Sequence, residues 1–264
     1  MKRSALFIGQ LAFTLLVCAF MLVPVLMSLL AGLTRNYFQG LSSGLTFDWL
    51  GQVWQAYSPT VWLSLQLALA CALCVCVLGV PAAYALVRMN NRFSRAFEEL
   101  MVLPVAMPGL ASALALLLTY GQFGEFRSSW VFILVGHVLF TLPFLVRPVM
   151  AVMQRQHLPV LEEAAASLGA GPIRRFFSVV LPNCRAGILA GVLMVVTLSL
   201  GEFNLTWMLH TPMTKTLPVG LADSYASARL EVASAYTLIF LMMIVPLLIA
   251  LQAISARLSR GEHR

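Results

Sequence analysis

The sequence predicts an all-α membrane protein with about six transmembrane helices. Three observations lead to this prediction: 60% of the 264 residues are hydrophobic, only 10% are charged, and the apolar residues gather in long runs. A soluble domain is typically about a quarter charged. A water-facing shell cannot be built from 17 Lys and Arg and 10 Asp and Glu residues in a chain of this length. Much of the surface must therefore face lipid.

Each apolar run is long enough to cross a bilayer, which takes about 20 predominantly apolar residues. The predicted spans are 6–31, 60–87, 100–120, 130–153, 184–208 and 233–256. The first run is much longer than the roughly 7–15-residue apolar core of a signal peptide, so we expect it to be retained. Nothing marks a second domain, and residues 1–264 are predicted to form one transmembrane domain.

The basic residues predict the orientation, because Lys and Arg accumulate in short cytoplasmic loops. With the N-terminus inside, four basic residues lie outside, namely Arg35, Arg127, Lys215 and Arg229. The other 13 lie at or near the cytoplasm: Lys2, Arg3, Arg88, Arg92, Arg95, Arg147, Arg155, Arg174, Arg175, Arg185, Arg257, Arg260 and Arg264. Six spans return the chain to its starting side, so both termini are predicted to be cytoplasmic.

Several functions are excluded or disfavoured by missing patterns. The net charge of +7 comes from short clusters at the ends of apolar runs, which is not the basic face of a nucleic-acid-binding protein. Cys71-x-x-Cys74 lies in an apolar stretch without His, Asp or Glu nearby, so no metal site is predicted. The phosphate loop of an ATPase needs a lysine after glycine, whereas Lys2 and Lys215 follow Met1 and Thr214.

The inner loop 154–183 is the longest predicted cytoplasmic segment. Strong helix formers follow Pro159, and Gly169 to Pro172 should end the helix, since glycine tolerates a left-handed cap and proline cannot continue. Helical spacing places four small or apolar side chains on one face: Leu161, Ala164, Ala165 and Leu168. This ridge suits either a groove in a partner protein or the inner surface of the chain itself.

The same loop carries a longer pattern, Glu163-Ala164-Ala165, three residues, Gly169, nine residues, then Val179-Val180-Leu181-Pro182. It resembles the EAA motif of type I (MetI-like) permeases of binding-protein-dependent ABC importers, which reads Glu-Ala-Ala, three residues, Gly, nine residues, Ile-x-Leu-Pro. The departure is Val179, which keeps a β-branched apolar side chain where Ile is usual. The resemblance extends over roughly 60–256.

The resemblance implies a fold, a function and partners. The fold is that of a type I ABC importer permease, and the chain is a non-catalytic, multi-pass subunit of the bacterial inner membrane. The EAA-like loop, with Glu163, Ala164, Ala165, Gly169, Val179, Leu181 and Pro182, would dock on a cytoplasmic ATPase dimer that binds ATP and Mg. A periplasmic solute-binding protein and a second permease complete the family's assembly, and we expect a heterodimer rather than a homodimer.

Three polar residues within the spans are candidates for the translocation path, because ionisable groups in a bilayer usually face a bundle interior or a water-filled path. Glu202 and Asn204 stand in Gly-Glu-Phe-Asn, which looks like a segment of relatives that import polyamines, ferric iron or aminoalkylphosphonates. A polyamine-like solute is the first expectation. Glu202 also suits a helix–helix hydrogen bond, and His137 suits an interhelical hydrogen bond better than substrate contact.

Two other classes of membrane protein are alternatives: a membrane-embedded hydrolase and a secondary transporter. A rhomboid-type protease needs Gly-x-Ser-Gly, and a zinc metalloprotease needs His-Glu-x-x-His; the sequence contains neither. A secondary transporter, working without an ATPase, is the remaining alternative. It would typically show two similar halves, which this sequence lacks, and it would not explain the long inner loop.

Overall fold

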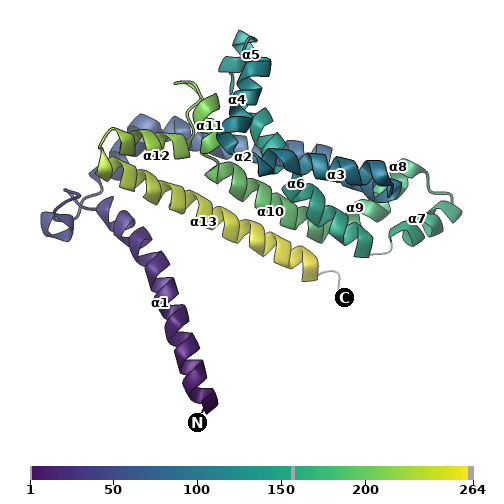
Figure 1. The fold of residues 1–264 in the computed structure, drawn as a ribbon, viewed down its shortest axis with the longest axis horizontal. Coiled ribbons are helices and arrows are strands. Elements are labelled where there is room, and N and C mark those ends of the chain that lie inside the picture. The colour runs from purple at the N-terminus through teal and green to yellow at the C-terminus, as the bar shows by residue number, and fades with distance from the viewer. Residues whose placement is uncertain (1, 156–157, 261–264) are drawn as a thin grey trace. The chain divides into compact units, whose positions relative to one another are not determined.

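The computed structural model describes residues 2–155 and 158–260, and these are almost entirely helical (Figure 1). Met1 and Arg264, which we expect in the cytoplasm, lie outside the described residues, and so do residues 156–157 of the inner loop. Four helices are long and apolar enough to span a membrane, and two bent helix pairs raise the number to as many as six. The prediction of an all-α protein with about six spans is confirmed.

The described chain packs into two compact units. The first unit contains α1 (Lys2–Ala31), the short helix η1 (Gly40–Ser43), the start of α2 (Asp48–Met89) and residues 220–243. Those last residues include parts of α12 (Leu217–Ala226) and α13 (Leu230–Arg260). The apolar side chains of α1 that the structure describes are exposed along most of its length, as expected of a helix surrounded by lipid or by another chain.

The second unit contains residues 60–219 and the chain from Ile244 onward. It includes most of α2 and the end of α13. Its other helices are α3 (Arg92–Ala106), α4 (Gly109–Tyr120), α5 (Gly124–Ser128), α6 (Trp130–Arg155), α7 (Leu158–Ser167), α8 (Pro172–Arg175), the π-helical turn η2 (Phe176–Val180), α9 (Leu181–Asn183), α10 (Arg185–Gly201) and α11 (Asn204–Leu209). It holds both predicted functional regions.

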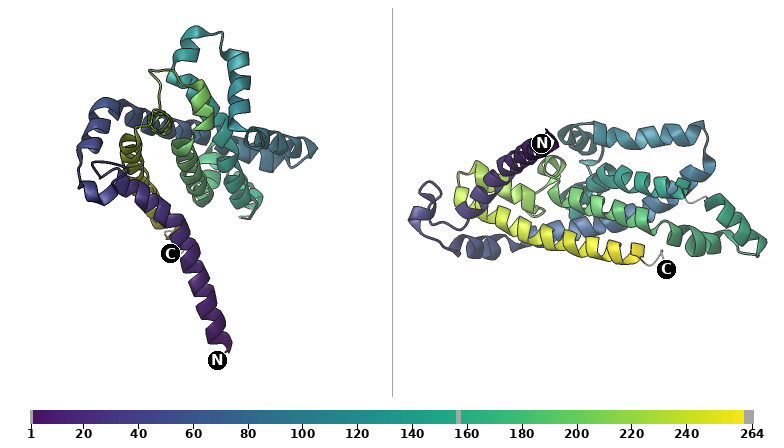
Figure 2. Two further views of the ribbon diagram at one scale, coloured as in Figure 1. Left: turned by 60° about the vertical axis from the view of Figure 1, so that its left-hand side comes forward. Right: turned by 90° about the horizontal axis from the view of Figure 1, so that it is seen from below.

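Helices α6 and α10 form the centre of the second unit and run side by side (Figures 1 and 2). Gly187 and Gly191, one turn apart on α10, allow this close contact. A Cβ at Gly191 would lie 2.8 Å from Leu145 Cα, and one at Gly187 would lie 2.8 Å from Pro148 O. Small residues spaced in this way let helix backbones approach each other in membranes.

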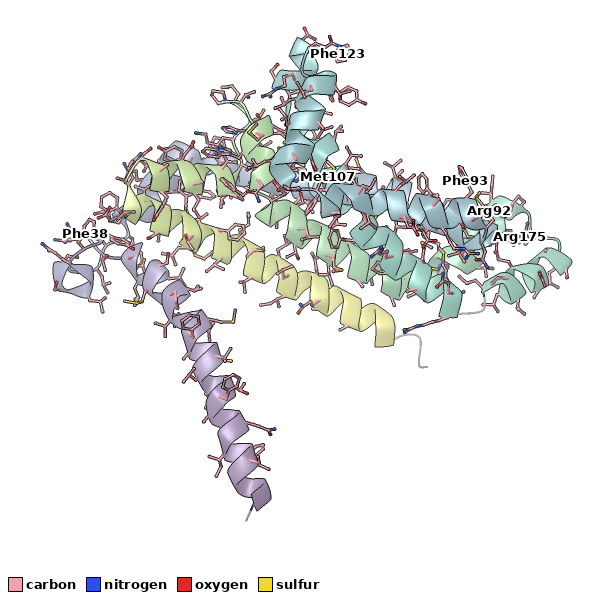
Figure 3. All side chains as sticks on the ribbon, viewed as in Figure 1. Phe38, Arg92, Phe93, Met107, Phe123 and Arg175 are labelled. Atoms are coloured by element: carbon pink, nitrogen blue, oxygen red, sulfur yellow. The ribbon has the colours of Figure 1, made fainter. Side chains whose placement is uncertain are left out.

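The third predicted span, 100–120, is not one helix. It consists of the second half of α3 and all of α4, which meet at an angle of 104° (Figure 3, Met107). Pro108 has no N–H and disfavours a helical residue before it, so Met107 is extended, with φ −85° and ψ 144°. Apolarity alone could not reveal this bend.

The fifth predicted span, 184–208, is interrupted as well. Helix α10 ends at Gly201, Glu202 takes an extended conformation with ψ 118°, and α11 begins at Asn204. At its other end, α10 makes an angle of 71° with the segment Pro172–Asn183. Helix α2 begins at Asp48, before the second predicted span, 60–87. Its first turns carry polar but helix-compatible residues, which an apolar window leaves out.

Candidate functional site

The helix predicted after Pro159 exists as α7, and its apolar ridge is open in this chain. Leu161 is 42% exposed and Leu168 is 89% exposed. Ala164 is also exposed, and Ala165 is half-buried. The alternative that the ridge packs on the chain's own inner surface is therefore wrong for the described residues. Ile173 and Phe177, in the second half of the loop, are exposed as well.

The turn after α7 depends on Gly169, which has a φ of +82°. Two hydrogen bonds close the helix: the N–H of Gly169 donates to Ala166 O, and the N–H of Ala170 donates to Ala165 O. This is a Schellman motif, in which glycine takes the left-handed conformation without steric cost. The predicted end of the helix is confirmed, and the chain reverses into α8 at Pro172.

The other motif residues lie in the second half of the loop. Val179 belongs to the π-helical turn η2, whereas Leu181 and Pro182 form the start of α9. All three are half-buried. Val179 O accepts a 2.7 Å hydrogen bond from Asn183 Nδ2, which satisfies a carbonyl where the regular helical ladder changes.

The two acids of α7 face different surroundings. Glu163 is exposed, but Glu162 is buried, with 3% exposure. The Tyr84 hydroxyl donates a 2.5 Å hydrogen bond to Glu162 Oε1, and Arg88 Nη1 lies 3.5 Å from the same oxygen. A buried carboxylate needs such partners. Sequence reasoning missed Glu162, and the only signal was a second acid next to the motif glutamate.

A second region with polar side chains forms where the two bent helix pairs meet. A Cβ at Gly109, the first residue of α4, would lie 3.1 Å from Asn204 Cβ and 3.5 Å from Glu202 Oε1. The break between α3 and α4 therefore lies against the break between α10 and α11. Two interrupted helices in contact place backbone polar groups inside an otherwise apolar bundle, which is tolerated only where those groups find partners or line a cavity.

Glu202 caps helix α11. Its two carboxylate oxygens accept 3.1 Å hydrogen bonds from the N–H groups of Leu205 and Thr206, and the Thr206 hydroxyl lies 3.2 Å from Oε2. These N–H groups have no partner within the helix, and a carboxylate is favoured at this end. Glu202 remains partly exposed, and Asn204 is exposed.

His137 lies behind this junction and is 1% exposed. Its Nδ1 is 2.8 Å from the Ser199 hydroxyl, and its Nε2 is 2.8 Å from the Thr206 hydroxyl. Helix α6 is thereby joined to both α10 and α11. The structure brings His137, Glu202 and Asn204 into one region, with His137 on the inner side.

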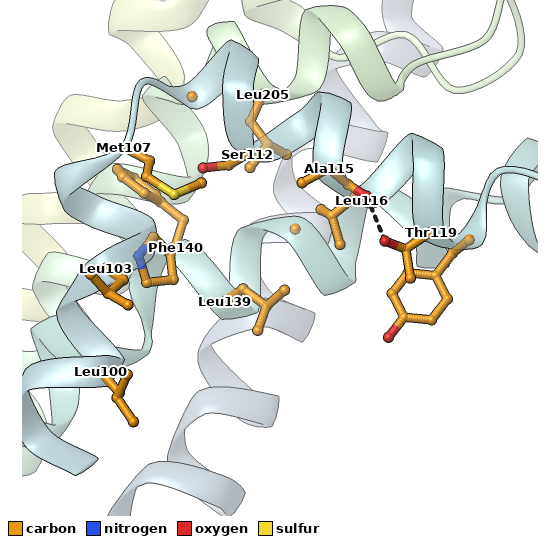
Figure 4. Close-up of a pocket in the computed structure, with 14 residues that line it drawn as sticks. Leu100, Leu103, Met107, Ser112, Ala115, Leu116, Thr119, Leu139, Phe140 and Leu205 are labelled. Atoms are coloured by element: carbon orange, nitrogen blue, oxygen red, sulfur yellow. Dashed lines mark hydrogen bonds between the residues drawn. The ribbon is translucent and has the colours of Figure 1, made fainter. Parts of the chain in front are cut away.

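A cavity of about 390 Å³ lies beside the junction, among α3, α4, α6 and α11 (Figure 4). Leu103, Met107, Phe140 and Leu205 contribute to its lining, which contains no charged side chain among the described residues. The Ser112 hydroxyl reaches this region without a hydrogen-bond partner in the described part of the chain. The apolar lining does not suit an ammonium group, so the cavity is not the region to which we assign substrate.

Comparison with known proteins decides the family. The sequence profile of the binding-protein-dependent transport system inner membrane component matches residues 76–260, more than half of the chain. The chain belongs to this family. It is the permease subunit of an ABC importer and a multi-pass protein of the bacterial inner membrane.

The permease has relatives with different named substrates. It is 29% identical over 219 residues to the putrescine transport system permease protein PotI of Escherichia coli K12, covering 80% of this chain and 77% of PotI. It is 29% identical over 202 residues to the sulfate transport system permease protein CysW of Synechocystis, covering 71% and 72%.

The permease fold is also seen in a solved structure. A chain of a bacterial ABC transporter involved in alginate import superposes with a TM-score of 0.73 at 15% identity, covering 97% of this chain and 96% of that one. At this identity the likeness concerns the fold. The comparisons give no support to a secondary transporter.

Proposed function

We propose that a separate cytoplasmic ATPase drives this permease by docking on the loop 158–183. The observation that supports the proposal most directly is the exposed apolar ridge of α7, with Leu161 and Leu168 open beside the left-handed turn at Gly169. A short helix with an open apolar face fits a hydrophobic groove in a partner. ATP and Mg would be bound by that ATPase, and this chain would need no cofactor.

In this proposal the chain contributes half of a translocation path. A second permease, a sister subunit rather than a copy, would contribute the other half, and a periplasmic binding protein would deliver the solute. ATP-driven closure of the ATPase dimer would move α7 and switch the pair between inward-facing and outward-facing states by rigid-body motion.

Glu202 and Asn204 are the residues we assign to the path. They lie at the break between α10 and α11 against the start of α4, and both retain exposed surface. The backbone N–H groups of α11 use part of the hydrogen-bonding capacity of Glu202, and a carboxylate has further lone pairs for a cation. A polyamine-like solute fits this carboxylate and the name of PotI, whereas the name of CysW favours an anion.

Two substitutions test the docking. Gly169→Asp strains the left-handed turn and adds a charge, and Ala165→Arg places a bulky cation on the ridge. Both variants should insert normally but lose ATP-dependent uptake and recover less ATPase in a detergent pull-down. Gly171→Ala is the control, because Gly171 has an ordinary φ of −66° and open space around it. Normal uptake and ATPase recovery in both variants would remove the docking proposal.

Uptake of labelled putrescine, 2-aminoethylphosphonate, ferric iron and sulfate, measured in cells expressing the complete operon, tests the substrate class. Glu202→Gln keeps the shape of the side chain and removes its charge, so it should lower the uptake of an amine. Glu125→Gln, at an exposed position on α5, is the matched control. Transport of sulfate alone would contradict the amine assignment without affecting the role of the loop.

A further inference from the structure

We propose that Tyr84 and Glu162 are positioning residues that fasten α7, the first helix of the docking loop 158–183, to the end of α2. The two helices would then move together when the ATPase closes. The inference rests on the proposed function of the loop. It concerns residues outside the EAA-like motif and assigns α2 as a helix that receives the movement of α7. Together, Tyr84, Arg88, Glu162 and Phe176 form the Tyr84 cluster.

The cluster joins segments that are distant in the chain. Tyr84 and Arg88 lie one turn apart on α2, Glu162 lies on α7, and Phe176 begins η2. Besides its hydrogen bond to Glu162, the Tyr84 hydroxyl accepts a 2.7 Å hydrogen bond from Arg88 Nη1. The Tyr84 ring meets the Phe176 ring edge-on, with 5.3 Å between centroids. The Tyr84 side chain of α2 thus contacts both halves of the docking loop 158–183.

The exposure of the two charged side chains shows that Glu162, rather than Arg88, depends on this contact. The Glu162 side chain is 4% exposed, whereas the side chain of Arg88 is 51% exposed. A carboxylate withdrawn from water is costly unless its partners stay in place, so separating α7 from Tyr84 would leave Glu162 without its hydrogen bond. The contact therefore resists separation, while the neighbouring ridge stays open for a partner. A surface ion pair would give no such restraint.

The experiment uses the complete transporter in nanodiscs, with spin labels at Ser167→Cys on α7 and Met89→Cys on α2, in a background without the native cysteines. Both positions are exposed, and neither belongs to the ridge or to the Tyr84 cluster. The distance between the labels is measured with and without ATP and vanadate. With wild-type Tyr84 and Glu162, the distance distribution should stay the same in both states, because α7 and α2 move as one body.

Tyr84→Phe removes the hydroxyl and keeps the ring on Phe176, and Glu162→Gln removes the charge. The ATPase should still co-purify with each variant, since the ridge is untouched. The distance should then change on ATP trapping, and uptake should fall about fivefold or more, the lower end of ordinary coupling between sites. Glu99→Gln on α3 and Tyr225→Phe on α12, both exposed, are the matched controls.

The outcomes separate the two proposals. A wild-type complex without ATP-dependent uptake or a bound ATPase would overturn both. A wild-type complex that transports, with Tyr84→Phe and Glu162→Gln transporting equally well at an unchanged label distance, would overturn the positioning role and leave the docking of the loop standing. A label distance that already changes in the wild type would also overturn the positioning role.

Discussion

His137 Nε2 lies 2.8 Å from the Thr206 hydroxyl, although 69 residues separate the two in the chain. Thr206 in turn donates its backbone N–H to Glu202, so the buried imidazole of α6 holds the short helix that follows the break in the fifth span. An interrupted helix inside a bilayer is stable only when its freed backbone groups are satisfied. Glu202 satisfies the freed N–H groups of Leu205 and Thr206, and His137 holds the Thr206 side chain of the same short helix.

Replacing His137 by Leu should destabilise the permease. The change removes two interhelical hydrogen bonds, each worth about 0.6 kcal/mol on average in measured membrane cases and at most about 1.7. A loss of about 1–3 kcal/mol is expected, measured as a lower unfolding midpoint in detergent. Thr197→Val is the control, because in the described part of the chain that hydroxyl donates its hydrogen bond within α10, to Leu193 O. Equal midpoints for wild type and His137→Leu would contradict the role of His137.

Gly191→Ala should also destabilise the permease. The added Cβ would stand 2.8 Å from Leu145 Cα, a backbone atom that cannot move away without shifting α6. Overpacking of this kind costs about 1–3 kcal/mol. Gly201→Ala, at the end of the same helix with nothing within 4 Å, should leave the unfolding midpoint unchanged or raise it slightly. A tolerated Gly191→Ala would mean that α6 and α10 are less closely packed.

Gly169→Ala isolates the backbone requirement of the turn. The space around Gly169 is open, so the substitution adds strain only through φ, at about 1–2 kcal/mol. Gly169→Asn should cost less, because asparagine tolerates the left-handed region better. ATP-dependent uptake should rank wild type first, then Asn, then Ala. Equal uptake in all three would show that the turn relaxes without loss.

Leu168→Cys should react rapidly with a water-soluble maleimide and be protected when the ATPase binds. Its side chain is 89% exposed on the proposed docking face. Leu158→Cys, at 3% exposure and at the start of α7, should react slowly in both states. The five native cysteines are replaced first. Reaction at Leu168→Cys that is equally fast with and without bound ATPase would contradict docking at the ridge.

The sequence by itself determined that the protein lies in a lipid bilayer, that it has about six spans and to which family it belongs. Long apolar runs and few charges leave no alternative to lipid, and the helix formers after Pro159 together with Gly169 predicted α7 and the turn that ends it. These features are local, because helix propensity, chain reversal and hydrophobic length depend on neighbouring residues.

Only the tertiary structure decided which polar groups meet. Glu162 resembles its neighbour Glu163 in sequence, yet it is buried because α7 packs its inner side against Tyr84. Glu202 interrupts a span because its carboxylate caps α11, and Gly109 lies against that break. Contacts of this kind join residues far apart in the chain, and their energy depends on burial and partners that no local pattern specifies.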